Sequence, residues 1–116
     1  MIEIRNRRTD EVVATRATEA ATHWSRFRGL IGRRRLEAGG GLVIRPSTSI
    51  HMLFMLFTID AVFFDEDDHV TRATSNVRPW IGFAAGGRSA VGVVELPRGA
   101  AAGVEPGDQL AFIEQS

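Results

Sequence analysis

His51 and Asp60 lie near the two ends of an apolar-rich segment, SIHMLFMLFTID, residues 49–60. An imidazole and a carboxylate that face one cleft could hold a small ligand or exchange protons with a substrate. The alternative is structural, with His51 bonded to a loop carbonyl and Asp60 capping backbone amides. We expect Asp60 to be structural and His51 to be the better ligand-binding candidate. If the protein is an enzyme, His51 and Asp60 are its catalytic candidates.

Apolar and cationic residues could complete a site around His51. Met55 lies in the same apolar-rich segment and Trp80 follows a proline, so both could line a pocket. Arg28 and Arg33 belong to a basic cluster that also includes Arg26, Arg34 and Arg35, and this cluster could receive an anionic group or an acidic partner. The common alternative is a solvated face in which one arginine pairs with a buried acid.

Glu95 is the acid that most needs such a partner, because it lies at the apolar end of the run VGVVEL. A buried carboxylate must be paired or protonated. We therefore expect Glu95 to be a structural polar residue that pairs with Arg28 or Arg33.

The remaining chemistry-bearing residues support neither a metal nor a cofactor. The turn DEDDH over residues 65–69 offers carboxylates and an imidazole, but consecutive turn residues point in different directions and an EF-hand loop needs a glycine and a distant Glu. The chain has no cysteine, which excludes disulfides and thiolate centres. It also has no G-x-S-x-G elbow and no P-loop lysine. We expect no metal site and no cofactor.

Mainly short strands must position these residues. Alternation and turn residues predict strands over 2–5, 11–15, 42–44, 59–64, 70–73, 90–96 and 109–113. Apolar spacing after Thr18, with Thr18 as N-cap and an end at Gly29 or Gly32, predicts one helix. A helical turn is expected after Pro97. The 116 residues then form a single domain, a small mainly β (α+β) sandwich or barrel of six to seven strands with one accessory helix.

Charge and hydropathy exclude several classes of protein. The apolar-rich run of 15 residues over 50–64 contains a histidine and an aspartate and is too short to span a bilayer. Net charge is zero, which argues against a nucleic-acid-binding protein, although residues 1–35 carry nine Arg against four acids. No basic start leads into an apolar segment, so we expect a soluble cytoplasmic protein without a signal peptide.

Three motifs in order resemble the domain-of-unknown-function 192 (DUF192) family: RFRGLIGRRRLEAGGGLVI, SIHMLFMLFTIDAVFFDEDDHV and VVELPRGAAAGVEPGDQLAF, within about residues 12–113. The matching positions include Arg28-Gly29-Leu30, His51, Ile59-Asp60, Glu95-Leu96-Pro97 and Gly107-Asp108. The resemblance implies a mainly β, jelly-roll-like domain with an accessory helix, and it implies no reaction. We expect Asp108, like Asp60 and Glu95, to be a structural polar residue. Leu56 stands where the family pattern has a basic residue, and Thr58 stands where it has a proline. If the basic residue contacts an anionic ligand in the family, Leu56 removes or alters that contact here.

Three functions follow as hypotheses. The first is a non-enzymatic module that binds a small molecule or a partner near the 49–60 stretch, through His51, Met55 and Trp80. The second is a hydrolase or carbohydrate-active enzyme that uses His51 with Asp60 or Asp65. The third is a module that binds an acidic protein partner through its arginine cluster, including Arg28 and Arg33.

Overall fold

The computed structural model describes residues 1–20, 36–52 and 55–115, and these residues form strands and turns. Alternating burial in three of the strands, as in the inward Ile2, Ile4 and Asn6 of the first, is the pattern of strands with one face in a core. The nine strands are β1 (Ile2–Asn6), β2 (Glu11–Ala20), β3 (Gly40–Ile44), β4 (Ser49–His51), β5 (Ile59–Phe64), β6 (Val70–Val77), β7 (Phe83–Ala85), β8 (Gly92–Pro97) and β9 (Leu110–Glu114).

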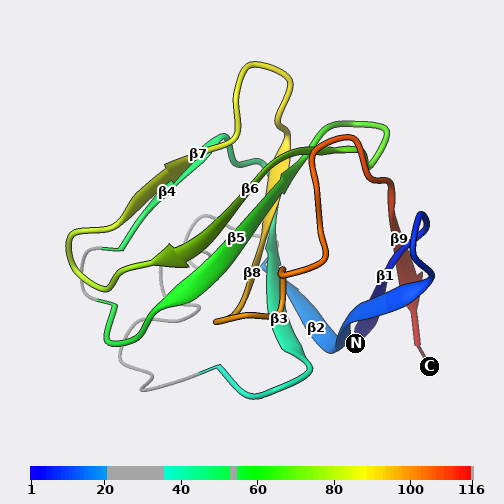
Figure 1. The fold of residues 1–116 in the computed structure, drawn as a ribbon, viewed down its shortest axis with the longest axis horizontal. Helices are drawn as coiled ribbons and strands as arrows, with labels where there is room; N and C mark the ends of the chain where they lie inside the picture. The colour runs from blue at the N-terminus through cyan, green and yellow to red at the C-terminus, as the bar shows by residue number, and fades with distance from the viewer. Residues whose placement is uncertain (21–35, 53–54, 116) are drawn as a thin grey trace.

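Seven of these strands form one sheet in the order β6-β5-β8-β3-β2-β1-β9, and β4 pairs with β7 in a second, small sheet. All pairs are antiparallel except β2 with β3. The large sheet curls so that its two edges meet: His69 bridges to Gln109, and the Val70 N–H donates to the Asp108 carbonyl at 2.7 Å. The result is a half-barrel with the small sheet beside it (Figure 1).

Alternation along β5 divides the interior into two cores. Ile59, Ala61 and Phe63 face a core shared with the small sheet, while Val62 and Phe64 face the inside of the half-barrel. All six β5 side chains are buried, because this strand is covered on both faces. The small sheet contributes Ile50 and Ala84 to the first core, so the opposite face of that sheet points outward.

Several expectations are corrected by the fold. Thr18 is not a helix cap, because residues 11–20 form one continuous strand whose parallel pairing with β3 extends to Ala20. The remainder of the expected helix lies outside the described residues. The tertiary pairing of β2 with β3 therefore overrides the local helical spacing at the beginning of that segment.

The strand inventory also differs from the expectation. The sequence analysis missed β4 and β7, which are only three residues long and pair with each other. The expected strand over 70–73 continues to Val77. The mainly β class is confirmed: the described residues form one curled, half-barrel sheet and one small sheet, with no accessory helix among them. None of the described segments forms a helix with the length and apolar character needed to span a membrane.

Candidate functional site

Asp60 lies fully buried in β5, on the face that points into the half-barrel. Its Oδ2 accepts hydrogen bonds from the N–H groups of Gly99 at 3.0 Å and Ala101 at 3.1 Å, and its Oδ1 accepts one from Asn76 at 3.1 Å. These bonds join β5 to the end of β6 and to the turns that follow Pro97. Both oxygens are therefore engaged with backbone, and the carboxylate has no surface on which a substrate could bind.

His51 lies at the end of β4 with its side chain exposed, directly opposite Phe83 of β7. Cross-strand partners in an antiparallel pair place their side chains on the same face of the sheet. His51 and Phe83 therefore share the outer face, and buried Ile50 marks the inner one. The structure thus separates His51 from Asp60: the imidazole meets solvent and the carboxylate is enclosed in a core.

Trp80 is brought to the same end of the small sheet as His51. The backbone N–H of Trp80 donates to the Met52 carbonyl at 2.8 Å, and the backbone N–H of Met52 donates to the Gly82 carbonyl at 2.9 Å. Trp80 has a positive φ of 66°, which is rare for a bulky residue and stores backbone strain. Its side chain is 49% exposed in spite of its size. The strained backbone holds an indole at the surface next to the small sheet.

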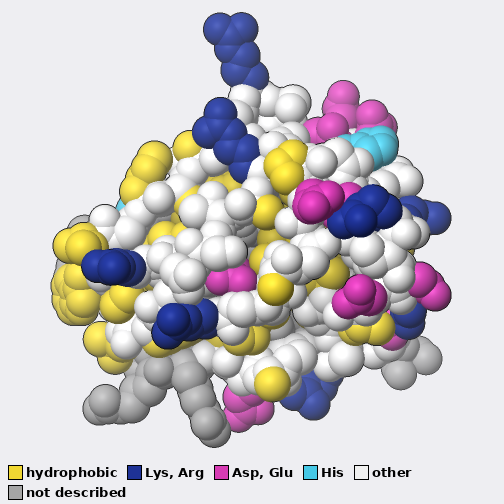
Figure 2. Space-filling model, viewed as in Figure 1, with side chains coloured by type: hydrophobic (Ala, Val, Ile, Leu, Met, Phe, Trp, Pro, Cys, Tyr) yellow, Lys and Arg dark blue, Asp and Glu magenta, His cyan; other side chains and the backbone are white. Residues whose placement is uncertain are grey.

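Three more large apolar side chains are exposed at this end of the molecule: Leu56 at 44%, Ile81 at 79% and Phe83 at 64%. We call the set Leu56, Trp80, Ile81 and Phe83 the apolar tip. Figure 2 shows hydrophobic side chains gathered at the left edge, over the small sheet and the β6–β7 connection. A cluster of this kind differs from the single exposed hydrophobic residues that any surface carries.

The turn that carries the apolar tip has little freedom to rearrange. The Gly82 N–H donates to the Arg78 carbonyl at 2.9 Å, which closes the turn. A Cβ at Gly82 would clash with the backbone carbonyl and nitrogen of Arg78, so glycine is required there by close approach. The sequence therefore specifies one geometry for this surface.

The other predicted site residues fall elsewhere. Met55 is only 6% exposed and belongs to the core beneath the small sheet, together with Met52. Arg28 and Arg33 lie outside the described residues, as does the rest of the arginine cluster. Glu95 is buried in β8 opposite Leu42, and the partners expected for it are the same two undescribed arginines.

Asp108 forms a buried polar network at the start of β9. The carboxylate accepts hydrogen bonds from the Asn6 side chain at 2.9 Å and from the Glu105 N–H at 2.8 Å, and it pairs with the Arg8 guanidinium. The hydrogen bond from Arg8 is the main reason that the pKa of Asp108 falls from 3.8 to about 2, with the bonds from Glu105 and Asn6 adding to it against the opposing effect of burial. This network ties β1 to β9 and is structural in its geometry.

The acidic turn between β5 and β6 brings three possible metal ligands together. Ligand atoms of Asp65, Asp67 and His69 lie within 4.8 Å of one another. Asp65 Oδ1 already accepts hydrogen bonds from the N–H groups of Asp67 and His69, both at 2.9 Å. The cluster is thus explained by the turn itself, and exposed acidic groups of this kind are common without a metal.

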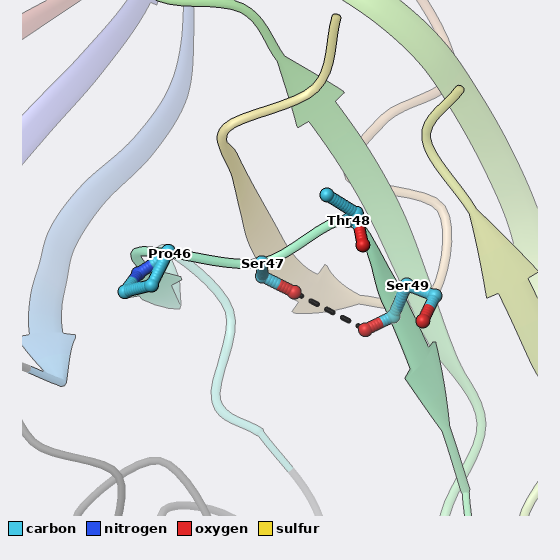
Figure 3. Close-up of a pocket in the computed structure, with 4 residues that line it drawn as sticks. All are labelled: Pro46, Ser47, Thr48 and Ser49. Carbon is cyan, nitrogen blue, oxygen red and sulfur yellow. Dashed lines mark hydrogen bonds between the residues drawn. The ribbon is translucent and has the colours of Figure 1, made fainter. Parts of the chain in front are cut away.

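A shallow hollow of about 220 Å³ lies between β3 and β4, lined by Pro46, Ser47, Thr48 and Ser49 (Figure 3). The Ser47 hydroxyl donates to the Ser49 carbonyl at 3.1 Å and stabilises this connection. The hollow opens to solvent, and the part of its lining that the structure describes contains no histidine or acid. It supplies hydroxyl groups without a base to activate them, so it lacks the parts of a nucleophilic site.

Ile81 and Phe83 are the surface residues that the sequence reasoning missed. The signal was present, because RPWIGF places three large apolar residues between a proline and a glycine-rich run, where a turn is expected to be polar. Arg8 and Asn6 were also missed. Nothing local indicates that they would meet Asp108, which lies about a hundred residues away in the chain.

Solved structures with the same fold exist in two bacteria. A protein of unknown function from Novosphingobium aromaticivorans DSM 12444 superposes with a TM-score of 0.81 at 22% sequence identity, over 95% of this chain and 82% of that one. A proposed transcription regulator from Sinorhizobium meliloti 1021 superposes with a TM-score of 0.80 at 21% identity, over 96% of this chain and 91% of that one. At this level of identity the likeness concerns the fold alone.

Comparison with curated proteins finds no match. The family model described as Uncharacterized ACR, DUF192, matches residues 4–112, which is nearly the whole chain, and thereby confirms the resemblance found in the three sequence motifs. The family carries no established activity, and neither structural relative supplies one. This chain belongs to the DUF192 family.

Proposed function

We propose that this protein is a non-enzymatic binding module that docks a partner through the apolar tip. The observation that carries the proposal is the exposure of Ile81 at 79% and Phe83 at 64%, together with Trp80 and Leu56, at the end of the molecule where Figure 2 shows hydrophobic side chains gathered. Water contact with such side chains is unfavourable, and full burial of one of them against a partner contributes about 1.5–3 kcal/mol. A cluster of four supplies the apolar centre that binding surfaces use.

The geometry around His51 favours binding over catalysis. A general base needs a substrate-accessible partner that orients it. Asp60 is enclosed with both oxygens bonded to backbone N–H groups, and Asp65 is bonded within its own turn. His51 instead borders Phe83 across the small sheet, where an imidazole can serve as a polar contact at the edge of an apolar surface.

The closed turn at Arg78–Gly82 also supports a docking role. Ordering a mobile loop on binding costs free energy, whereas a surface already held in place avoids that cost. The bonds from Gly82 to Arg78 and from Trp80 to Met52 hold the backbone of the apolar tip before any partner arrives. The strained φ of Trp80 is maintained by these same bonds.

The absence of cysteine from the sequence allows a direct test. A benzophenone attached to Ile81→Cys would be photoactivated in a cell extract that retains its membranes, and the adducts would be identified by mass spectrometry. The matched control carries the same label at Ala102→Cys, an exposed position in the turns after β8. We expect defined protein or lipid adducts from position 81 that are absent from position 102.

The same experiment includes a second substitution, Phe83→Ser, which removes apolar surface from the tip without touching the core. It should reduce the adducts from position 81 at least severalfold. Equal labelling from positions 81 and 102, or labelling at 81 that survives Phe83→Ser, would show that the apolar tip is not a docking surface.

A further inference from the structure

We infer that the partner of the apolar tip is an anionic lipid surface. This inference rests on the docking role proposed above and adds the class of partner. It combines three observations: the charge of the segments that build this part of the molecule, the outward form of the turn, and the presence of a tryptophan beside arginine.

The segments that build the apolar tip and the small sheet contain no acid. Residues 38–59 and 69–94 include no Asp or Glu, although the chain has 14 acidic residues in total. The same two ranges contain Arg72, Arg78 and Arg88, together with Arg45, which pairs with Glu19 at 3.8 Å and is not counted toward this surface. Segments that carry cationic and apolar side chains and no acid of their own are complementary to a layer that presents negative charge above hydrocarbon.

Arg78 lies at the tip itself, whereas Arg72 and Arg88 lie toward the opposite end of the small sheet. Arg78 is exposed and begins the turn that carries Trp80 and Ile81. Arg72 reaches from β6 to the Ala85 carbonyl at 3.5 Å, and exposed Arg88 lies in the β7–β8 connection. In Figure 2, basic side chains lie near the hydrophobic group, at the top and on the right, whereas the acidic ones lie mainly on the right-hand side, away from the hydrophobic group.

The form of the tip favours a lipid layer over a peptide segment. Protein hot spots usually fill pockets on the partner and are ringed by further contacts, whereas Ile81 lies within the five-residue turn Arg78–Gly82 with 79% of its surface exposed. In Figure 1 the β6–β7 connection forms the left-hand extremity of the fold. A turn that extends outward can enter the headgroup region, where tryptophan is favoured because its ring is amphipathic.

The expected binding has a defined charge dependence. Each arginine near an anionic surface contributes about 1 kcal/mol, which corresponds to about fivefold in the partition coefficient. Arg78→Gln should therefore weaken vesicle binding about fivefold. Arg98→Gln, a matched change of an exposed arginine in the turn after β8, should leave binding unchanged. High salt should weaken binding as well, because the screening length falls to about 3 Å at 1 M.

The test uses the full chain with an environment-sensitive nitrobenzoxadiazole label at Ile81→Cys and measures emission and co-sedimentation. The probes are vesicles of phosphatidylcholine with phosphatidylglycerol, vesicles of phosphatidylcholine alone, and soluble glycerol phosphate. We expect a blue shift and co-sedimentation with the anionic vesicles, binding at least tenfold weaker to the neutral ones, and no shift with glycerol phosphate. The label at Ala102→Cys should report no change.

Several results would overturn the inference. Equal binding to neutral and anionic vesicles would remove the role of the arginines, as would equal effects of Arg78→Gln and Arg98→Gln. A shift with glycerol phosphate alone would assign the site to a soluble phosphate. Absence of vesicle binding together with protein adducts from photolabelled position 81 would reject the lipid surface and retain docking, whereas absence of both would reject docking itself.

Discussion

Asp108→Asn should lower the free energy of unfolding by an amount that depends on pH. The pKa of Asp108 lies at about 2 in the folded chain because of Arg8 and two further donors, against 3.8 in the absence of these contacts. Each pH unit of such a difference is worth about 1.4 kcal/mol. The charged carboxylate therefore contributes about 2 kcal/mol to the free energy of unfolding at pH 7.

The sign follows from the direction of the change. A carboxyl group whose folded pKa is lowered binds fewer protons in the folded state, so its contribution is complete above about pH 4 and is lost as the pH falls towards 2. Roughly half should remain at pH 3. Asp108→Asn has no proton to exchange, and its other effects on hydrogen bonding are the same at every pH.

Urea unfolding of both proteins at pH 7, 5, 4, 3 and, where the fold persists, 2.5 measures this difference, because the remaining acids titrate alike in the two chains. The free energy of unfolding of the original protein should exceed that of Asp108→Asn. This difference should shrink by more than 1 kcal/mol between pH 7 and about pH 3 or below. Asp10→Asn, whose side chain is 87% exposed, is the matched control. A margin that stays constant across this range would refute the reasoning from the Asp108 network.

Three further outcomes are expected. In the original protein three backbone N–H groups donate to the Asp60 carboxylate, and Asp60→Asn replaces it with an amide. Chemical denaturation should show that the free energy of unfolding falls by at least about 2–3 kcal/mol. Gly92→Ala brings a Cβ to within 2.5 Å of the Phe64 ring and should lower the melting temperature by several degrees, whereas Gly103→Ala meets nothing within 4 Å and should not. Phe83→Ser should leave the unfolding free energy within about 0.5 kcal/mol, measured by the same denaturation, since this side chain is 64% exposed.

Much of the strand pattern could be predicted from local sequence. Alternation in β1 and the acidic turn after β5 reflect strand geometry and turn chemistry, which depend on neighbouring residues. The short strands β4 and β7 could not be predicted, because three residues carry too little periodicity and each forms only by pairing with the other. The β2 strand shows the converse case, in which pairing with β3 overrides helical spacing at Thr18.

The candidate site divides in the same way. The sequence by itself determined the family and the presence of apolar residues near Pro79, because motifs and residue types are local properties. Only the tertiary structure decided that His51 and Asp60 lie apart and that Met55 enters the core while Ile81 and Phe83 stay outside. The physical reason is that a residue's burial depends on which face of which sheet receives it. That choice is made by pairing between strands distant in the chain, as when β6 and β9 meet and leave the small sheet with one covered and one open face.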